Sequence, residues 1–227
     1  MDEHLRERWL LVWEKNKKRF FLYTLLVLAV AGILTGLSIF RNEMDKKAWA
    51  KFNLATTYFQ QAQSSEDDKG RLAKYQKAKS LYEEVLSRYP WTKVRKEALF
   101  YLGNCLYCLG EYKQAGQILQ KFCRRYEDDY FFPWAEIKLA FAYEQQGQYE
   151  EAIKTYEELL KKYPDNVLAP QALLGMARCL ELQGKWNEAL SKYEELVSRY
   201  PLSSEAALGE VQIQRLKGER KVIMSEG

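Results

Sequence analysis

Several kinds of functional residue are scarce in this sequence. It has one histidine, His4, and four cysteines in 227 residues, and it contains no glycine-rich phosphate loop or nucleophile motif. Its net charge of +4 is divided evenly, with +2 over residues 1–19 and +2 over residues 41–227. Nucleic-acid domains show a clustered basic excess, which is missing here. We therefore predict a protein that is not an enzyme, takes no cofactor or metal, and binds neither nucleic acid nor a small-molecule substrate.

Charge is absent altogether from residues 20–40, which read FFLYTLLVLAVAGILTGLSIF. A helix of this length extends about 31 Å, close to the hydrocarbon thickness of a bilayer. The stretch is longer than the apolar region of a cleaved signal peptide, and neither an A-x-A-like site nor a cysteine for lipid attachment follows it. A buried soluble helix is the alternative, but such helices rarely lack a polar face over six turns. We predict a single transmembrane signal-anchor over residues 20–40.

The flanking residues predict how this anchor is oriented. In residues 1–19, Leu5, Trp9, Val12 and Trp13 share one helical face, which is typical of a membrane-surface segment or of a docking helix for a cytoplasmic partner. The predicted membrane-interface residues are Trp9, Trp13, Lys17, Lys18, Arg19 and Arg41. Basic residues are denser before the span than after it, which favours a cytoplasmic N-terminus. Residues 41–227 are then predicted to lie in the periplasm of a bacterium, anchored in its inner membrane.

The remainder of the chain repeats with a period of 37 residues. The four columns that show it are Ala78, Ala115, Ala152 and Ala189; Tyr89, Tyr126, Tyr163 and Tyr200; Tyr75, Tyr112, Tyr149 and Trp186; and Gly110, Gly147 and Gly184. Within each period, two runs with helical apolar spacing are separated by a turn. Glycine ends the first run because it tolerates a left-handed conformation, and the proline after tyrosine stops the second. Each period is therefore a helix hairpin that cannot bury its apolar face alone, and the predicted fold class is all-α.

These hairpins resemble the tetratricopeptide repeat, whose pattern is W-x₂-L-G-x₂-Y…A-x₃-F…P. The third period carries the pattern as Leu139, Ala140, Tyr143, Ala152, Tyr156 and Pro164. The resemblance implies a right-handed solenoid over residues 41–216. Its predicted parts are four hairpins at about 47–90, 96–127, 133–164 and 170–201, a cap helix at 203–216 and a flexible tail at 217–227. The first hairpin fits only with an 11-residue insertion, which we expect in a polar turn around residues 64–70. In the cap helix, Ala206, Ala207 and Val211 are expected to face inward.

In this family the first helix of each unit lines a concave groove that binds partner proteins. The groove residues carried over by position are Trp49, Phe52, Phe59, Phe100, Asn104, Tyr107, Trp134, Ile137, Phe141 and Arg178. Their aromatic character suits an extended or helical apolar segment, such as an unfolded client or a partner's helix. Packing between adjacent units is the alternative for Phe52, Phe100 and Ile137, because their column is apolar in every unit.

An anchor followed by such repeats resembles the ancillary SecYEG translocon subunit family (YfgM-like proteins). That resemblance implies a periplasm-facing scaffold that engages the translocon, chaperones or newly exported clients. The alternatives are an envelope-assembly or cell-division coordinator, and a protein of reversed topology with cytoplasmic repeats. A third is a membrane-anchored thiol oxidoreductase that uses Cys105 and Cys108. Cys105 shares its column with Ala142 and Cys179, and the C-x-x-C lies inside a predicted helix, so packing is favoured over thiol chemistry.

Overall fold

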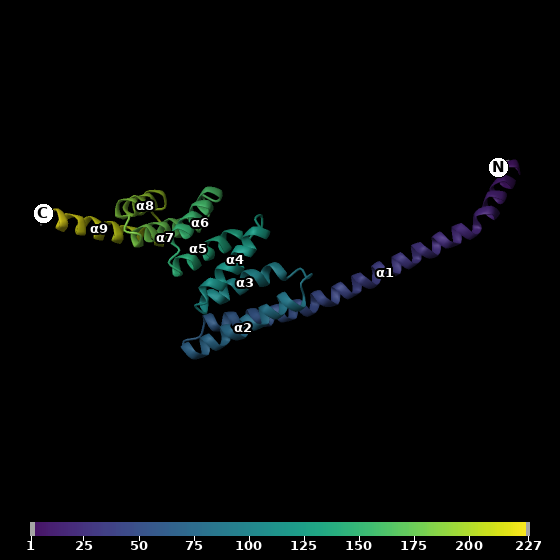
Figure 1. The fold of residues 1–227 in the computed structure, drawn as a ribbon, viewed down its shortest axis with the longest axis horizontal. Helices are drawn as coiled ribbons and strands as arrows, with labels where there is room; N and C mark the ends of the chain where they lie inside the picture. The colour runs from purple at the N-terminus through teal and green to yellow at the C-terminus, as the bar shows by residue number, and fades with distance from the viewer. Residues whose placement is uncertain (1–2, 226–227) are drawn as a thin grey trace. The chain divides into compact units, whose positions relative to one another are not determined.

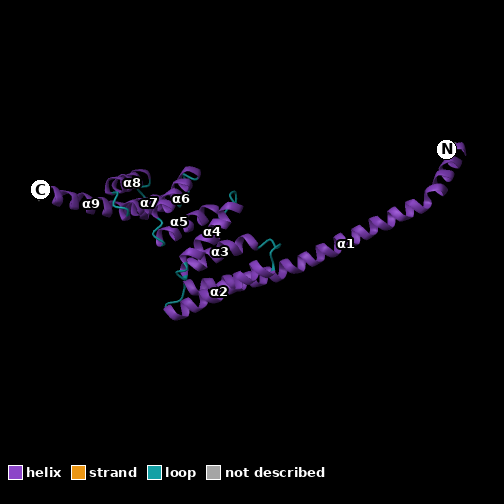
Figure 2. Cartoon of the chain, viewed as in Figure 1, coloured by secondary structure: helices purple, strands orange, loops and turns teal. Residues whose placement is uncertain are grey.

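The computed structural model describes the backbone of residues 3–225 and the side chains of residues 8–9 and 13–218. Over this range the chain forms nine α-helices and no strand (Figures 1 and 2), which confirms the predicted fold class. The helices are α1 (Glu3–Gln63), α2 (Asp68–Arg88), α3 (Arg95–Cys108), α4 (Tyr112–Arg125), α5 (Phe132–Gln145), α6 (Tyr149–Lys162), α7 (Ala169–Leu182), α8 (Trp186–Arg199) and α9 (Ser204–Ser225). They belong to two compact units, Met1–Ala48 and Trp49–Gly227, which we describe separately.

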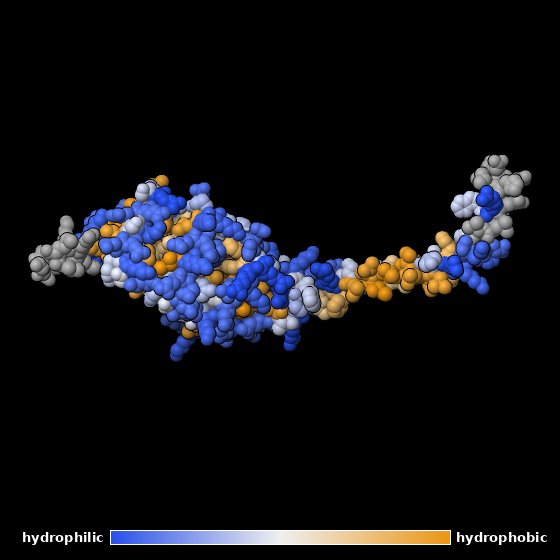
Figure 3. All heavy atoms as spheres, turned by 45° about the horizontal axis from the view of Figure 1, so that its top comes forward, coloured by the Kyte–Doolittle hydropathy of each residue, from blue (hydrophilic) through white to orange (hydrophobic). Residues whose placement is uncertain are grey.

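The first unit is helical throughout its described part. The uncharged stretch of α1 is solvent-exposed along its whole length, and Figure 3 shows it as a continuous hydrophobic segment. By length and composition, α1 is the one helix among the described residues that could cross a membrane. Before the stretch, the rings of Trp13 and Phe20 lie 5.2 Å apart. The side chains of Leu5 and Val12, which were predicted to share a face with Trp9 and Trp13, lie outside the described residues.

The second unit is a stack of helix hairpins in which each helix packs against the next, from α2 to α9. The alanine column, Ala78, Ala115, Ala152 and Ala189, is fully buried, because a small residue lets the two helices of a hairpin approach closely. Gly110, Gly147 and Gly184 adopt φ angles of 72–76° at the turns, as the spacing predicts. The tyrosine column forms the C-caps of α2, α4, α6 and α8. The local sequence pattern thus specifies where the helices of each hairpin begin and end.

The 11-residue insertion of the first hairpin was expected in a polar turn around residues 64–70, but the structure places most of it in helices. Helix α1 ends nine residues after Leu54, whereas α5 ends six residues after the equivalent Leu139. Helix α2 begins seven residues before Tyr75, whereas α4 begins at the equivalent Tyr112. Asp67 caps α2 by accepting hydrogen bonds from the amides of Lys69 and Gly70. The insertion therefore lengthens both helices and leaves only a short turn, because helical hydrogen bonds and a side-chain cap satisfy the added backbone groups.

The inward face of the cap helix was predicted correctly at one of three positions. In α9, Ala206 is buried as expected, but Ala207 is exposed and Val211 is 63% exposed. The buried positions are instead Ala206, Gly209, Ile213 and Leu216. A Cβ atom added to Gly209 would lie 3.2 Å from the side chain of Leu196 in α8. The absence of a side chain at Gly209 therefore lets α9 pack closely against α8. Helix α9 also continues to Ser225, beyond the predicted end of the cap at residue 216.

Candidate functional site

The predicted groove positions share one face of the first helix in each hairpin. We call this the first-helix surface and define it by three columns of positions. They are Trp49, Glu97, Trp134 and Gln171; Thr56, Asn104, Phe141 and Arg178; and Phe59, Tyr107, Glu144 and Glu181. The backbone at each column is equivalent, so the differences between units come from side chains alone.

Half of the predicted groove residues are buried and cannot meet a partner in this structure. Phe52, Phe59, Phe100, Asn104 and Ile137 are each at most 8% exposed. The rings of Phe52 and Phe59 pack against Tyr101 of the next unit, with centroids 5.6 and 6.0 Å away. The Asn104 amide donates to the carbonyl of Phe100 in its own helix, 3.0 Å away. The structure thus makes these five residues inaccessible, and for Phe52 and Phe59 the neighbouring unit covers the rings; partner binding itself stays a prediction.

The other predicted aromatic residues remain accessible. Trp49 and Trp134 are 40% and 38% exposed, and Tyr107 and Phe141 are half-buried. The rings of Tyr107 and Phe141 lie 6.4 Å apart. The ammonium group of Lys138 is 5.5 Å from the centroid of Tyr107 and 5.4 Å from that of Phe141, which is cation–π geometry. The middle of the first-helix surface thus combines aromatic rings with a positive charge.

Toward the C-terminus the same surface becomes a ladder of charged pairs. Arg178 of α7 donates two hydrogen bonds to the carboxylate of Glu144 in α5, one of them from Nη2 at 2.8 Å. The Tyr156 hydroxyl donates to the same carboxylate over 3.2 Å, and burial raises the pKa of Tyr156 so that it stays protonated. One unit later, Arg215 and Tyr193 donate in the same way to Glu181.

Sequence reasoning missed this ladder, although its signal was present. Glu144 and Glu181, Tyr156 and Tyr193, and Arg178 and Arg215 are three further columns with the 37-residue period. The Arg178 side chain, predicted as a groove residue, remains 44% exposed, but its guanidinium is engaged by Glu144. Only the outer edge of the Arg178 guanidinium can contact a partner while the ion pair with Glu144 stays intact. Breaking that pair would be costly, because the Glu144 side chain is 7% exposed.

The cysteines lie in positions that suit packing. Cys105 is buried in α3, its Sγ lies 3.0 Å from the carbonyl of Tyr75, and burial raises its pKa to about 12. Burial likewise raises the pKa values of Cys123 and Cys179 to about 12. Cys108 is exposed but lies at the C-terminal end of α3, where the helix dipole does not stabilise a thiolate. These features disfavour a thiol oxidoreductase centred on Cys105 and Cys108.

Two further predictions concern metal ligands and the membrane-interface residues of α1. Among the described side chains, no group of three or more histidine, cysteine or acidic residues could hold a metal ion; the side chain of His4 lies outside the described range. All six membrane-interface residues are exposed, Trp9 by 74%. Lys17 pairs with Glu14 over 3.3 Å on the helix surface.

Comparison with known proteins supports the fold and its class of function. The tetratricopeptide repeat family profile matches residues 67–130 and 132–201. A Podosopora anserina protein with nearly identical TPR-like repeats has a TM-score of 0.60 and 18% identity, covering 79% of this chain and 90% of that one. A tetratricopeptide repeat protein from Parabacteroides merdae has a TM-score of 0.55 and 17% identity, covering 74% and 61%. No curated protein matches the sequence.

Tetratricopeptide repeats serve as scaffolds for protein–protein interaction, and the fold is typically non-catalytic. The 37-residue columns, the hairpins from α2 to α8 and the two matched stretches agree on residues 67–201. The chain is a tetratricopeptide repeat protein.

Proposed function

We propose that this protein is a membrane-anchored scaffold that binds other proteins through its first-helix surface, at the protein export machinery of a bacterial inner membrane. Residues 1–19 lie in the cytoplasm, residues 20–40 span the bilayer, and residues 41–216 form a periplasmic array. The bound segments belong to the translocon, a periplasmic chaperone or an exported client. The resemblance of this architecture to YfgM-like proteins supports that setting.

The accessible cluster of Tyr107, Phe141 and Lys138, together with the exposed Trp134 on the same helix as Phe141, is the observation that carries the proposal. Large aromatic side chains are enriched among residues that dominate binding energy. Lys138 places a positive charge beside the rings. The cluster therefore suits an apolar partner segment, extended or helical, that carries an acidic residue at one position.

The apolar part of α1 supports membrane anchoring. It is uncharged over 21 residues, fully exposed, and preceded by basic residues and tryptophans. Burying such a stretch in a bilayer removes a large apolar surface from water. Anchoring also restricts the array to the membrane surface, which raises its effective concentration near membrane partners.

The binding surface can be tested with the full chain in its membrane. We expect Trp134→Ala combined with Phe141→Ala to weaken partner binding about tenfold or more, since each residue is a candidate for more than 1 kcal/mol. A photo-crosslinking residue at position 134 should form adducts with translocon or chaperone subunits, identified by mass spectrometry. Trp91→Ala is the matched control, because Trp91 is 85% exposed in the turn between α2 and α3. Equal binding by a folded double variant would refute the surface assignment.

Topology needs its own measurement. Protease added outside spheroplasts should digest residues 41–227 and leave the anchor, whereas intact cells should protect them. Full protection in spheroplasts would place the array in the cytoplasm and exclude a periplasmic role.

A further inference from the structure

Glu136 stands where the repeat otherwise places a core residue. Its column contains Leu99 and Leu173 in the second and fourth units, which are 1% and 0% exposed. Glu136 is nearly as buried, at 7%. In the first unit the column contains Lys51, allowing for the insertion, and Lys51 pairs with Glu84 over 3.1 Å. The Lys51 side chain is 40% exposed, so Glu136 is the buried charged residue of this column.

The Glu136 carboxylate has no such ion pair among the described residues. Its Oε2 atom is buried and has no hydrogen-bond partner in that part of the chain. Of the nearby lysines, Lys162 donates to the carbonyl of Glu127 over 3.0 Å and lies 4.2 Å from the ring centroid of Phe132. Lys154 is largely exposed and lies 4.0 Å from Glu158. Burial, followed by the carboxylates of Glu158 and Glu127, raises the pKa of Glu136 to about 7 against the lowering effect of Lys162. Leaving a buried carboxylate unsatisfied destabilises the free protein.

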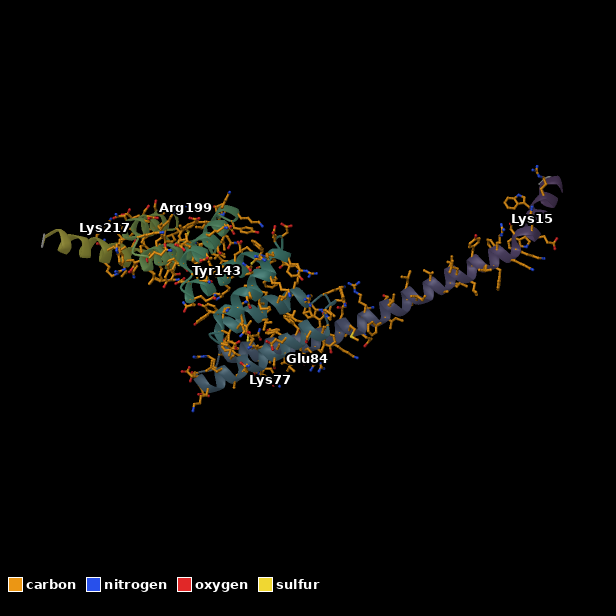
Figure 4. All side chains as sticks on the ribbon, in the orientation of Figure 1. Lys15, Lys77, Glu84, Tyr143, Arg199 and Lys217 are labelled. Carbon is orange, nitrogen blue, oxygen red and sulfur yellow. The ribbon has the colours of Figure 1, made fainter. Side chains whose placement is uncertain are left out.

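A cavity of about 350 Å³ opens onto this residue between α4, α5 and α6. Phe132, Leu139 and Tyr143 line it with apolar surface, and Figure 4 marks Tyr143 on α5. The charged lining consists of the carboxylates Glu127, Glu136, Glu151 and Glu158, opposed by Arg124 and Lys154. Glu136 and Trp134 are two positions apart on α5, which places them about 200° apart around the helix. The cavity is therefore separate from the first-helix surface.

We propose that this cavity binds the side chain of a lysine or arginine presented by a partner protein. The cationic group pairs with the Glu136 carboxylate, and the aliphatic stem lies against Phe132 and Leu139. A buried carboxylate in the lining of a partly apolar cavity matches a side chain that has a charged end and an apolar stem. A divalent metal is a poorer match, since no group of ligands among the described side chains could hold one. The array thus has a second interaction surface between its second helices.

Binding of such a cation is coupled to pH. The bound form needs ionised Glu136, whose pKa is about 7 in the free protein. Affinity should therefore fall as the pH drops below 7. The other titratable or charged groups that line the cavity or act on Glu136 are Cys123, Arg124 and Glu127 from α4 and its following turn, Tyr143 from α5, and Glu151, Lys154, Glu158 and Lys162 from α6.

The test uses the full chain in detergent with ¹³C-labelled glutamate carboxyls, assigned by comparison with Glu136→Gln. The probe is the acetylated, amidated tripeptide Leu-Lys-Leu, and its control replaces lysine by norleucine, which keeps the stem without the ammonium group. We expect the lysine peptide to shift the Glu136 signal, to lower its apparent pKa by at least one unit, and to bind about tenfold more tightly at pH 8 than at pH 6. The norleucine peptide should leave the Glu136 signal unchanged.

Variants separate charge recognition from folding. Glu136→Leu should lose at least tenfold in affinity for the lysine peptide while remaining folded, because leucine occupies this column in two other units. Glu136→Gln keeps the shape of the side chain and should lose as much. Glu157→Gln removes an exposed carboxylate of α6 outside this cavity and should bind within twofold of the parent chain. The proposal is overturned if the parent chain does not bind the lysine peptide, if it binds the norleucine peptide equally, or if both Glu136 variants keep their affinity.

Discussion

Equivalent residues in successive repeats take different roles in this array. One column of the first-helix surface holds Tyr107, Glu144 and Glu181, and the neighbouring column holds Asn104, Phe141 and Arg178. The aromatic pair Tyr107 and Phe141 faces solvent in part, whereas Glu144 and Arg178 satisfy each other. Side-chain substitution on a constant backbone thus changes the surface from aromatic to charged along its length.

Glu136 leads to a prediction at the scale of one residue. Replacing it by leucine removes an unsatisfied buried carboxylate and restores the residue of the equivalent positions. We expect Glu136→Leu to raise the free energy of unfolding by about 1 to 3 kcal/mol. Urea denaturation of the full chain in detergent at pH 8 measures this change. A loss of stability in the leucine variant would mean that the carboxylate has a structural partner.

The pH dependence of the same variant checks the cause. The pKa of Glu136 rises from 4.5 to about 7 on folding, so the folded state binds the proton more tightly. Stability of the parent chain should therefore fall as the pH rises from 4.5 to 7, by on the order of 3 kcal/mol from this group. The leucine variant should lack that contribution to the decline.

At the scale of the helices, glycine sets how closely neighbouring hairpins approach. A Cβ atom added to Gly175 in α7 would lie 2.5 Å from the ring of Tyr156 in α6. That ring carries the hydroxyl that donates to Glu144. The glycine therefore makes room for the tyrosine, and the tyrosine supports the ladder of charged pairs.

We predict that Gly175→Ala costs about 1 to 3 kcal/mol, because the added methyl group displaces a fully buried tyrosine. Gly116→Ala in α4 is the matched control. The nearest atom to its added Cβ is 3.5 Å away, so it should raise helix stability by about 0.5 to 1 kcal/mol. Thermal unfolding followed by circular dichroism distinguishes the two. Equal effects of both alanines would contradict the packing described for α6 and α7.

For the whole molecule, the division at Ala48 separates the candidate anchor from the array. Among the described side chains, the buried apolar residues begin at Ala48 and Phe52, whereas the uncharged stretch of residues 20–40 is exposed. We predict that a chain of residues 41–227 stays folded, with a thermal midpoint within a few degrees of the full chain, and leaves the membrane fraction. Carbonate extraction followed by circular dichroism measures both properties. The full chain should resist extraction, and its release by carbonate would argue against a spanning helix.

Much of the architecture could be predicted from local patterns. The glycine columns, the tyrosine caps and the helical spacing specified hairpins over residues 96–201, because the forces that start and end a helix act within a few residues. The first hairpin was less predictable. Its insertion lengthens two helices. The composition of the insertion is typical of a polar turn, but most of its residues continue the helical hydrogen bonding and Asp67 caps α2.

The features of the candidate sites also divide into those that follow from the sequence and those that depend on the tertiary structure. The sequence by itself determined the all-helical repeat and an uncharged stretch long enough to span a bilayer. Only the tertiary structure decided that Phe52, Phe59, Phe100, Asn104 and Ile137 are buried, that Arg178 is bound by Glu144, and that Glu136 is buried without a partner. The physical reason is that burial and pairing depend on atoms contributed by neighbouring units, whereas the repeat pattern reports only the chemistry within one unit.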